Sequence, residues 1–441
     1  MKPCREEYST LLRLGVPIII GQLGMIVLGF ADTIMIGRHS TAELASAGFV
    51  NNVVNLLIIV GSGFSYGLTP VVGSLFGKGQ IDGVGAELKN ALAANLLLAL
   101  LMVLVYVPVY LSLGYMGQPS ELLPLIRPYF LLTLASVPVV MAFNAFRQFA
   151  DSITDTSLSM WILVCGNAAN ILGNYLLIYG KFGLPEMGLA GAGVSTFLSR
   201  VAMLVAIIWV FFHSRRYDVY RKSFVSSRIE AGGVRRLFSL GAPIAAQCGM
   251  ETFSFTMSAV MAGWIGATAL ASHQVMITIA NMTFMTYYGM GAAVSIRVSH
   301  FVGRGDRQHT VSTAHAGHML MLCITAMVVI PIFLMRDSLG GLFNDNPNVV
   351  AGVASLVIPF SLYQLGDGLQ INYSNALRGM ADVKVMMYIA FVAYFIVGIP
   401  AAYVFGFVFH LGIVGVWLGF PFGLTTAGIL YKRRFNKKVA A

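Results

Sequence analysis

The chain alternates long apolar stretches with short polar joints about twelve times along its 441 residues. A membrane-spanning helix needs roughly 20 largely apolar residues, and each stretch reaches that length. Only 10% of the residues are charged, against about 25% in an average soluble protein. The sequence therefore predicts an all-α integral membrane protein with twelve transmembrane helices. The predicted spans are residues 12–37, 47–76, 88–113, 124–147, 157–179, 188–212, 237–263, 270–299, 312–335, 349–376, 385–409 and 411–431.

The net charge of +10 is spread unevenly along the chain. Most lysines and arginines lie at the two termini or in the joints after even-numbered spans, including the long joint at 213–236. Basic residues are enriched in cytoplasmic loops, so both termini and this joint are predicted to be cytoplasmic. The same distribution argues against a nucleic-acid-binding surface. Four basic residues depart from the pattern and fall in odd-numbered joints: Arg38, Arg127, Lys181 and Arg336.

The two halves of the sequence match when one is shifted by 226 residues. LGVPI at 14–18 aligns with LGAPI at 240–244, and MIGRHSTAELAS at 35–46 aligns with MAGWIGATALAS at 261–272. Six spans per copy is an even number, so both copies enter the membrane in the same direction and a substrate path is expected between them. A duplicated scaffold without a path is the alternative. The predicted organisation is a six-helix lobe at 1–212, a cytoplasmic basic linker at 213–236 and a second six-helix lobe at 237–441.

Three carboxyl groups lie inside predicted spans: Asp32 in GFADTIMIG, Glu251 in QCGMETFSF and Asp367 in SLYQLGDGLQINYS. A charge within the bilayer costs at least about 2.5–3.5 kcal/mol on insertion scales, so such an acid is either neutralised or used. Shifted by 226, Asp32 falls on Ser258, which lies about two turns after Glu251 on the same helix face. Each half therefore presents an acid from the equivalent helix face. The alternative, that each carboxyl only hydrogen-bonds to neighbouring helices, stays open.

The surroundings of Asp367 resemble a site for a hard cation. Tyr363 precedes the acid by one turn on the same face, and glycines 366 and 368 flank it. Such glycines would loosen the helix and expose backbone carbonyls, which sodium accepts as ligands together with carboxylates. Close packing against another helix is an equally good explanation of the glycines.

A second polar group lies in the first half of the chain. Asn170 and Asn174 are four residues apart in the fifth predicted span, and Thr196 is early in the sixth. Together with Asp32 they would form an oxygen-rich cluster, although spacing alone favours asparagines that join helices by hydrogen bonds. No metal site is predicted other than one for a transported sodium ion.

These motifs resemble the multidrug and toxic compound extrusion (MATE) family, in its bacterial NorM-like branch. The resemblance rests on an ordered set that covers nearly the whole chain: FADTIMIG, NYLLIYGKFG at 174–183, GAAVSIRVSHFVG at 291–303, YQLGDGLQ at 363–370 and ALRG at 376–379. It implies twelve helices in two lobes forming a V that opens alternately to either side of the bacterial inner membrane. It also implies two sets of site residues: a cation site of Glu251, Asp367 and Tyr363 in the second lobe, and a cation and substrate site of Asp32, Asn170, Asn174 and Thr196 in the first.

The predicted function is therefore a multidrug efflux antiporter, not an enzyme, that exports cationic or amphipathic compounds in exchange for Na⁺ or H⁺. It is expected to act as a monomer, without a cofactor, among membrane lipids. A lipid-carrier flippase of related fold is one alternative, but it needs several basic residues in its spans to bind pyrophosphate, and only Arg200 and Arg297 qualify. An intramembrane transferase is another. It needs clustered acids that hold magnesium, whereas the three acids lie on separate spans.

Overall fold

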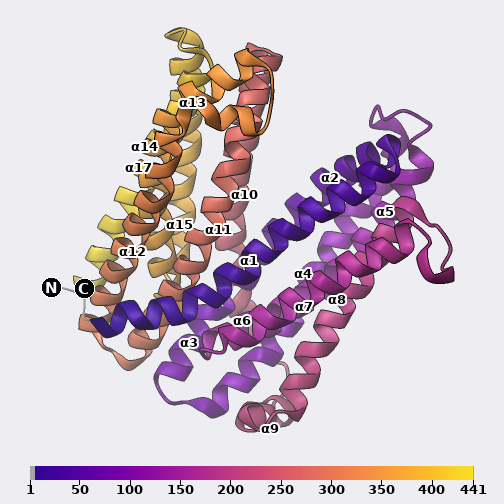
Figure 1. Ribbon diagram of the computed structural model, residues 1–441. Coiled ribbons are helices and arrows are strands. Elements are labelled where there is room, and N and C mark those ends of the chain that lie inside the picture. The colour runs from indigo at the N-terminus through magenta and orange to yellow at the C-terminus, as the bar shows by residue number, and fades with distance from the viewer. Residues whose placement is uncertain (1–4, 441) are drawn as a thin grey trace. The chain divides into compact units, whose positions relative to one another are not determined.

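The computed structural model describes residues 5–440, which form helices joined by short turns, with no strand among them (Figure 1). The all-α prediction is confirmed for this part of the chain. The helices in chain order are α1 (Arg5–His39), α2 (Thr41–Ser65), α3 (Leu68–Gly77), α4 (Ile81–Leu111), η1 (Leu113–Tyr115), α5 (Leu123–Ala135), α6 (Val137–Ser152), α7 (Thr156–Ile178), η2 (Lys181–Gly183), α8 (Gly188–His213), η3 (Arg215–Tyr217), α9 (Asp218–Ser226), α10 (Ala231–Ile265), α11 (Ala267–Arg304), α12 (Arg307–Leu334), α13 (Arg336–Leu339), η4 (Gly340–Leu342), α14 (Pro347–Gly379), α15 (Val383–Phe391), η5 (Val392–Gly398), α16 (Ile399–Tyr403), η6 (Val404–Val408) and α17 (Gly412–Ala440).

The predicted spans correspond to these helices. Ten helical segments of the described chain are long and apolar enough to cross a membrane. The other two predicted spans, 237–263 and 270–299, lie within α10 and α11, which are 35 and 38 residues long. Three spans are less regular than predicted. Residues 47–76 are divided between α2 and α3, residues 124–147 between α5 and α6, and residues 385–409 contain the π-helical segments η5 and η6.

Residue contacts divide the chain into two compact units. Unit 2 runs from Ile20 to Ala245, and unit 1 takes in the described residues up to Ile19 and those from Ala246 onward. The helices α1 and α10 therefore each begin in one unit and continue in the other. The lobes predicted from the sequence differ from these units in two places: the described residues up to Ile19 belong to unit 1, and residues 237–245 belong to unit 2. A repeat of 226 residues does not show which bundle the start of each copy packs against.

The first part of α1 packs in unit 1 and the first part of α10 packs in unit 2. Each contacts a neighbouring helix at a glycine, and the two glycines are equivalent in the repeat. In unit 1, α1 passes α11 at Gly15, which lies next to the side chain of Met290. In unit 2, α10 passes α2 at Gly241, which lies next to Phe64 and against the backbone of Gly67. Shifted by 226 residues, Gly15 falls on Gly241 and Phe64 falls on Met290. Small residues let two helices approach closely, so the sequence repeat is also a repeat of helix crossings.

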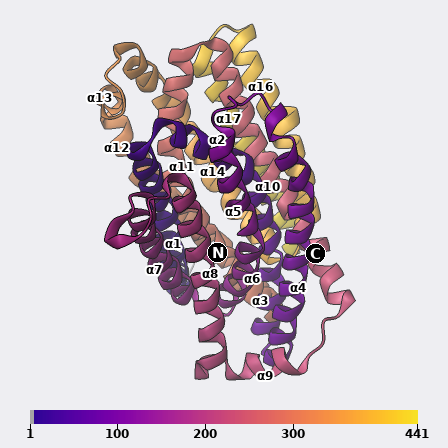
Figure 2. The same ribbon diagram turned by 90° about the vertical axis from the view of Figure 1, so that its right-hand side faces the viewer.

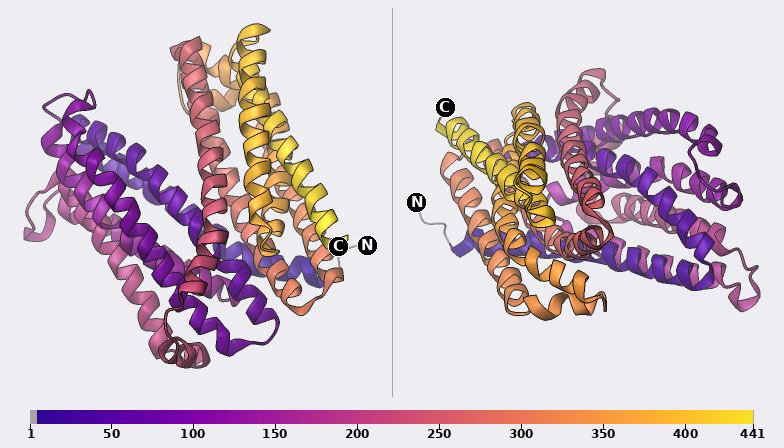
Figure 3. Two further views of the ribbon diagram at one scale, coloured as in Figure 1. Left: turned by 180° about the vertical axis from the view of Figure 1, so that it is seen from behind. Right: turned by 90° about the horizontal axis from the view of Figure 1, so that it is seen from above.

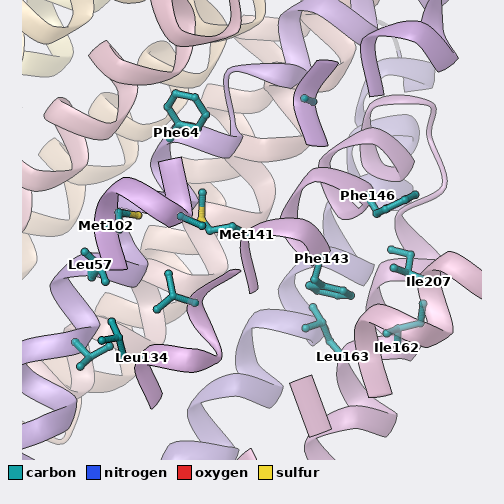
Figure 4. Close-up of a cluster of buried hydrophobic side chains, with 14 of the residues drawn as sticks. Leu57, Phe64, Met102, Leu134, Met141, Phe143, Phe146, Ile162, Leu163 and Ile207 are labelled. Carbon is teal, nitrogen blue, oxygen red and sulfur yellow. The ribbon is translucent and has the colours of Figure 1, made fainter. Parts of the chain in front are cut away.

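Unit 2 is built around one cluster of buried hydrophobic side chains. Phe64 on α2, Met102 on α4 and Met141 on α6 belong to this cluster (Figure 4). A Cβ atom at Gly61 would lie only 2.7 Å from the sulfur of Met141, so glycine permits this approach. The short helix α9 packs across α4 and α8 (Figure 2), where its aromatic side chains cover the end of the core.

Unit 1 is organised around α14 and α17, which lie side by side (Figures 1 and 3). The helices α11 and α12 also pack along α14. Phe360, Tyr363 and Trp417 are almost fully buried where α14 meets α17. The middle of α14, which carries the predicted acid Asp367, is therefore enclosed by other helices of unit 1 and has very little exposed surface.

Candidate cation and substrate sites

In unit 2, Asp32 on α1 meets polar side chains that come from α7 and α8. The side-chain amide of Asn174 donates a 2.5 Å hydrogen bond to Oδ1 of Asp32. One turn earlier on α7, the amide of Asn170 donates to the hydroxyl oxygens of Thr196 at 3.2 Å and Ser199 at 3.1 Å on α8. The structure thus places Asp32 against Asn174 and Thr196 against Asn170, and both asparagines are buried. We call Asp32, Asn170, Asn174 and Thr196 the unit 2 cluster.

The unit 2 cluster also has a basic neighbour. Arg200 on α8 attracts the Asp32 carboxylate electrostatically and donates a hydrogen bond to the hydroxyl of Ser136. Ser136 lies at the break between α5 and α6, where Pro138 occupies the first turn of α6 and lacks the N–H that a continuous helix would use. Asp32 is therefore compensated by one amide donor and one nearby guanidinium group.

In unit 1, Glu251 on α10 lies near Asp367 and Tyr363 on α14. The exposed fraction is 1% for Asp367 and 2% for Tyr363. Asp367 interacts electrostatically with both Glu251 and Tyr363. The Tyr363 hydroxyl lies near the Asp367 carboxyl, but within residues 5–440 no hydrogen bond with well-formed geometry reaches either carboxylate oxygen of Asp367 or Oε1 of Glu251. We call these three residues the unit 1 cluster; it brings together all the residues predicted for the second cation site.

Further polar side chains surround the unit 1 cluster. The hydroxyl groups of Tyr287 on α11 and Thr325 on α12 form a 2.6 Å hydrogen bond. The side-chain amide of Gln370 on α14 donates to the hydroxyl of Tyr394 at 3.1 Å, and Tyr394 also interacts with Glu251. Tyr394 lies in the π-helical segment η5, and such segments recur at functional sites. Polar groups from four helical elements, α11, α12, α14 and η5, therefore surround the two acids.

The charges around the two acids of unit 1 are unequal. The positive charge of Arg378, further along α14, attracts Glu251. In the described chain, no ion pair involves Asp367. The described residues also contain no group of three or more His, Cys, Asp or Glu side chains that could hold a metal ion. The donor set in unit 1 is two carboxyls with hydroxyl and amide oxygens, which suits a proton or a monovalent hard cation.

Of the two glycines beside Asp367, Gly366 has a packing role. The helix α14 continues unbroken from Pro347 to Gly379, so its carbonyls stay within the helix. A Cβ atom at Gly366 would lie 2.7 Å from the hydroxyl oxygen of Thr425 on α17. Of the two explanations left open by the sequence, close helix packing fits Gly366, because α14 packs tightly on α17 there.

Several polar neighbours of the two clusters are not predicted from the sequence. Ser199, Tyr287 and Gln370 are polar side chains inside apolar spans, and that property was the available signal. Tyr394 gave no comparable signal, because tyrosines are common near the ends of membrane helices and the sequence does not reveal a π-helical segment. Arg200 was noted as a basic residue in a span but was not connected to Asp32.

Comparison with known proteins identifies the family. A family model described as MatE matches residues 17–176 and 243–404, one region in each half of the chain. The chain belongs to the MATE family. The multidrug resistance protein NorM of Photobacterium profundum is 30% identical over 442 residues, covering 98% of this chain and 96% of that protein. The resemblance inferred from the motifs is thus confirmed.

Solved MATE structures share the fold. The eukaryotic MATE transporter AtDTX14 is 20% identical with a TM-score of 0.85, covering 98% of this chain and 99% of that one. An outward-facing multidrug resistance MATE family transporter is 19% identical with a TM-score of 0.88, covering 98% and 96%. This MATE-family chain is therefore an integral membrane protein with the family's twelve transmembrane helices. Membership places it among transporters rather than enzymes.

Proposed function

We propose that this MATE-family protein is an efflux antiporter that exports cationic or amphipathic compounds across the bacterial inner membrane while Na⁺ or H⁺ moves inward. The observation that carries the proposal is the pair of acids in the unit 1 cluster. Asp367 is buried beside Glu251, with the Tyr363 hydroxyl nearby and no well-formed hydrogen bond to either carboxylate oxygen within the described chain. Two neighbouring carboxylates in a low-dielectric interior need a proton or a bound cation to offset their charge. The unit 1 cluster therefore suits the coupling ion.

We assign the unit 2 cluster to the transported compound and to a second cation. Its carboxylate, Asp32, is only partly buried and already has a donor in Asn174. A partly exposed carboxylate can pair with an organic cation at a smaller desolvation cost than a fully buried one. Asn170 and Thr196 add oxygen atoms on the same side of the unit. NorM of Photobacterium profundum is described as a multidrug resistance protein, which agrees with a small-molecule substrate.

Coupling in this scheme requires that ion and drug favour opposite conformations. A membrane potential of 100 mV contributes about 2.3 kcal/mol for each positive charge that moves inward. One ion per cycle then sustains roughly a fifty-fold concentration gradient of a neutral solute. The topology that we propose has both termini and residues 213–236 in the cytoplasm, because basic residues concentrate there.

The decisive experiment measures efflux of a fluorescent organic cation from vesicles that contain the purified protein and carry an imposed Na⁺ or H⁺ gradient. We expect Asp367→Asn and Glu251→Gln each to abolish the gradient-driven part of efflux. Asp337→Asn is the matched control, because it removes a carboxylate of unit 1 whose side chain is 85% exposed. Uptake of radioactive sodium by the same vesicles distinguishes the two ions, since a protein coupled only to protons takes up none.

The scheme is wrong if both cluster variants retain full gradient-driven efflux. It is also wrong if they lose efflux only to the extent that the Asp337→Asn control does. Thermal unfolding of each variant in detergent checks that lost efflux does not reflect lost folding. Replacing a buried, unpaired carboxyl by its amide is expected to preserve or raise stability, because it removes a buried charge.

A further inference from the structure

A groove of about 740 Å³ runs along unit 2 between the end of α1 and α7. Its walls are mainly apolar, with Ile34 from α1 and Ile171 and Leu172 from α7. Ile34 and Leu172 are 52% and 59% exposed, so the groove opens to its surroundings. The hydroxyl of Tyr179 donates a 2.8 Å hydrogen bond to the carbonyl oxygen of Met35. This bond joins the two walls, so the groove is a defined feature of the folded unit.

Two basic residues, Arg38 and Lys181, lie at one end of the groove. Arg38 lies in the last turn of α1, which contains the first predicted span, and Lys181 follows α7, which contains the fifth. Both are odd-numbered spans, so the two residues are expected on the same side of the membrane. In the described chain neither residue takes part in an ion pair. The acids of this region, Glu43 and Glu186, instead contact His39 at 2.7 and 2.9 Å. Two of the four basic residues that depart from the charge pattern of the sequence therefore converge on one apolar groove without a partner for their charge.

The length of the groove matches one leaflet of a bilayer. Along α7 its lining extends from Ala168 to Tyr179, which is about 16 Å at 1.5 Å per residue. Half of the hydrocarbon core is about 15 Å. Tyr175 and Tyr179 lie near the basic end, with ring centroids 6.0 Å apart, and tyrosines are enriched where hydrocarbon meets headgroups. The basic end of the groove would thus lie at the level of the lipid headgroups, and its apolar part has the length of an acyl chain. A phospholipid needs both features in its binding site.

We propose that this groove is a binding site for an anionic phospholipid, whose headgroup lies between Arg38 and Lys181 and whose acyl chain follows α7. The two positive charges complement a phosphate and repel the organic cations that the transporter is proposed to carry. The site belongs to unit 2 alone, and its lining includes no residue of either acid cluster, although α1 and α7 also carry Asp32 and Asn174. It does not depend on which ion drives transport, so its failure would leave the proposed antiport mechanism untouched.

Native mass spectrometry of the full-length protein tests this site. The purified protein is incubated with an equimolar mixture of phosphatidylglycerol and phosphatidylcholine of equal chain length, and the retained lipids are counted. We expect wild type to prefer phosphatidylglycerol. Because a basic residue near a membrane surface contributes about 1 kcal/mol to binding of anionic lipid, the preference is expected to fall about fivefold for each of Arg38→Gln and Lys181→Gln. Arg127→Gln, on the same side of unit 2 but outside the groove lining, is the matched control and keeps the preference.

A steric variant tests the apolar part of the groove. Ala168 is an exposed residue at the far end of the lining, and Ala168→Trp fills this end without changing charge. We expect it to reduce phosphatidylglycerol retention as well. The proposal is overturned if wild type retains both lipids equally, if Arg127→Gln weakens the preference as much as Arg38→Gln does, or if Ala168→Trp loses binding of ethidium while lipid retention is unchanged. The last outcome would assign the groove to the transported cation.

Discussion

The crossing of α10 over α2 predicts a strong effect for Gly241→Ala. A Cβ atom at Gly241 would lie 2.6 Å from the carbonyl oxygen of Phe64 and 2.7 Å from its ring. Real Cβ atoms do not approach backbone atoms so closely, so one of the two helices must shift. Overpacking of this kind costs about 1–3 kcal/mol. Removing a helical glycine returns about 1 kcal/mol, so we expect a net loss of up to about 2 kcal/mol.

The equivalent position in the other half predicts a different outcome. The nearest atoms to a Cβ at Gly15 are the methyl carbon and sulfur of Met290, at 3.2 and 3.3 Å. A methionine side chain is flexible and can move aside, so Gly15→Ala is expected to leave stability unchanged or raise it by up to about 1 kcal/mol. Gly263→Ala is the control for helix propensity alone. It lies on α10, and a Cβ there would meet nothing within 4 Å.

Thermal unfolding of the purified variants in one detergent, followed by tryptophan fluorescence, measures these differences. The expected order of midpoints is Gly241→Ala lowest, then wild type, with Gly15→Ala equal to or above wild type and Gly263→Ala highest. A gap of about 2 kcal/mol between the two crossing variants corresponds to roughly a thirty-fold difference in the unfolding constant. Equal midpoints for Gly241→Ala and Gly15→Ala would refute the reasoning, since only the rigidity of the contacting atoms distinguishes the two sites.

Three further predictions concern local contacts. In the first, a double-mutant cycle of Asp32→Asn and Asn174→Ala is expected to show a coupling of at least about 1 kcal/mol in thermal unfolding, because a 2.5 Å hydrogen bond joins the two wild-type side chains. Purely additive effects would contradict this. Asp306→Ala is expected to cost about 1 kcal/mol, whereas Asp306→Asn costs less, because Asp306 caps α12 with a 3.0 Å hydrogen bond from a backbone N–H. That bond lowers the pKa of the Asp306 carboxyl. Its contribution to stability is therefore present at neutral pH and is lost as the pH falls through the lowered pKa. Equal unfolding midpoints of wild type and Asp306→Ala at neutral pH would contradict the capping role. Gly188→Ala is expected to lower stability by at least about 1 kcal/mol. Gly188 has φ +52°, and a methyl group there would collide with the Glu43 carboxylate. An unchanged unfolding midpoint would contradict this prediction and show that the loop adapts.

The number and order of the helices could be predicted because each apolar stretch has the length of a membrane span and the two halves share one pattern. The exchange of helix starts between the units could not. Gly15 and Gly241 align in the sequence, but alignment of two copies shows only that they are equivalent, not whether each packs within its own bundle. That choice depends on contacts with α11 and α2, which are remote in sequence.

Within the sites, the acids could be predicted because a carboxyl group in an apolar span is expensive. Their partners were harder to predict, for two different physical reasons. Asn174 and Thr196 were recognisable as polar residues in spans, but spacing could not distinguish ligands from residues that join helices. Tyr394 reaches the unit 1 cluster through the π-helical segment η5, and that change in helix register moves a side chain to a face that the ordinary 3.6-residue period does not predict.

The two acid clusters differ in how their charge is satisfied, and this difference has a consequence for coupling. In the structure, Asp32 has the amide of Asn174 as a donor and lies in the field of Arg200. Asp367 has only the nearby Tyr363 hydroxyl and no well-formed hydrogen bond in the described chain, so its free energy depends more on a proton or a cation. A ligand shifts a conformational equilibrium only through its differential affinity for the two states. If the ion acts as proposed, its differential affinity for the two conformations arises mainly at Asp367 and Glu251. Amides at both positions should then uncouple transport while binding of organic cations at Asp32 persists.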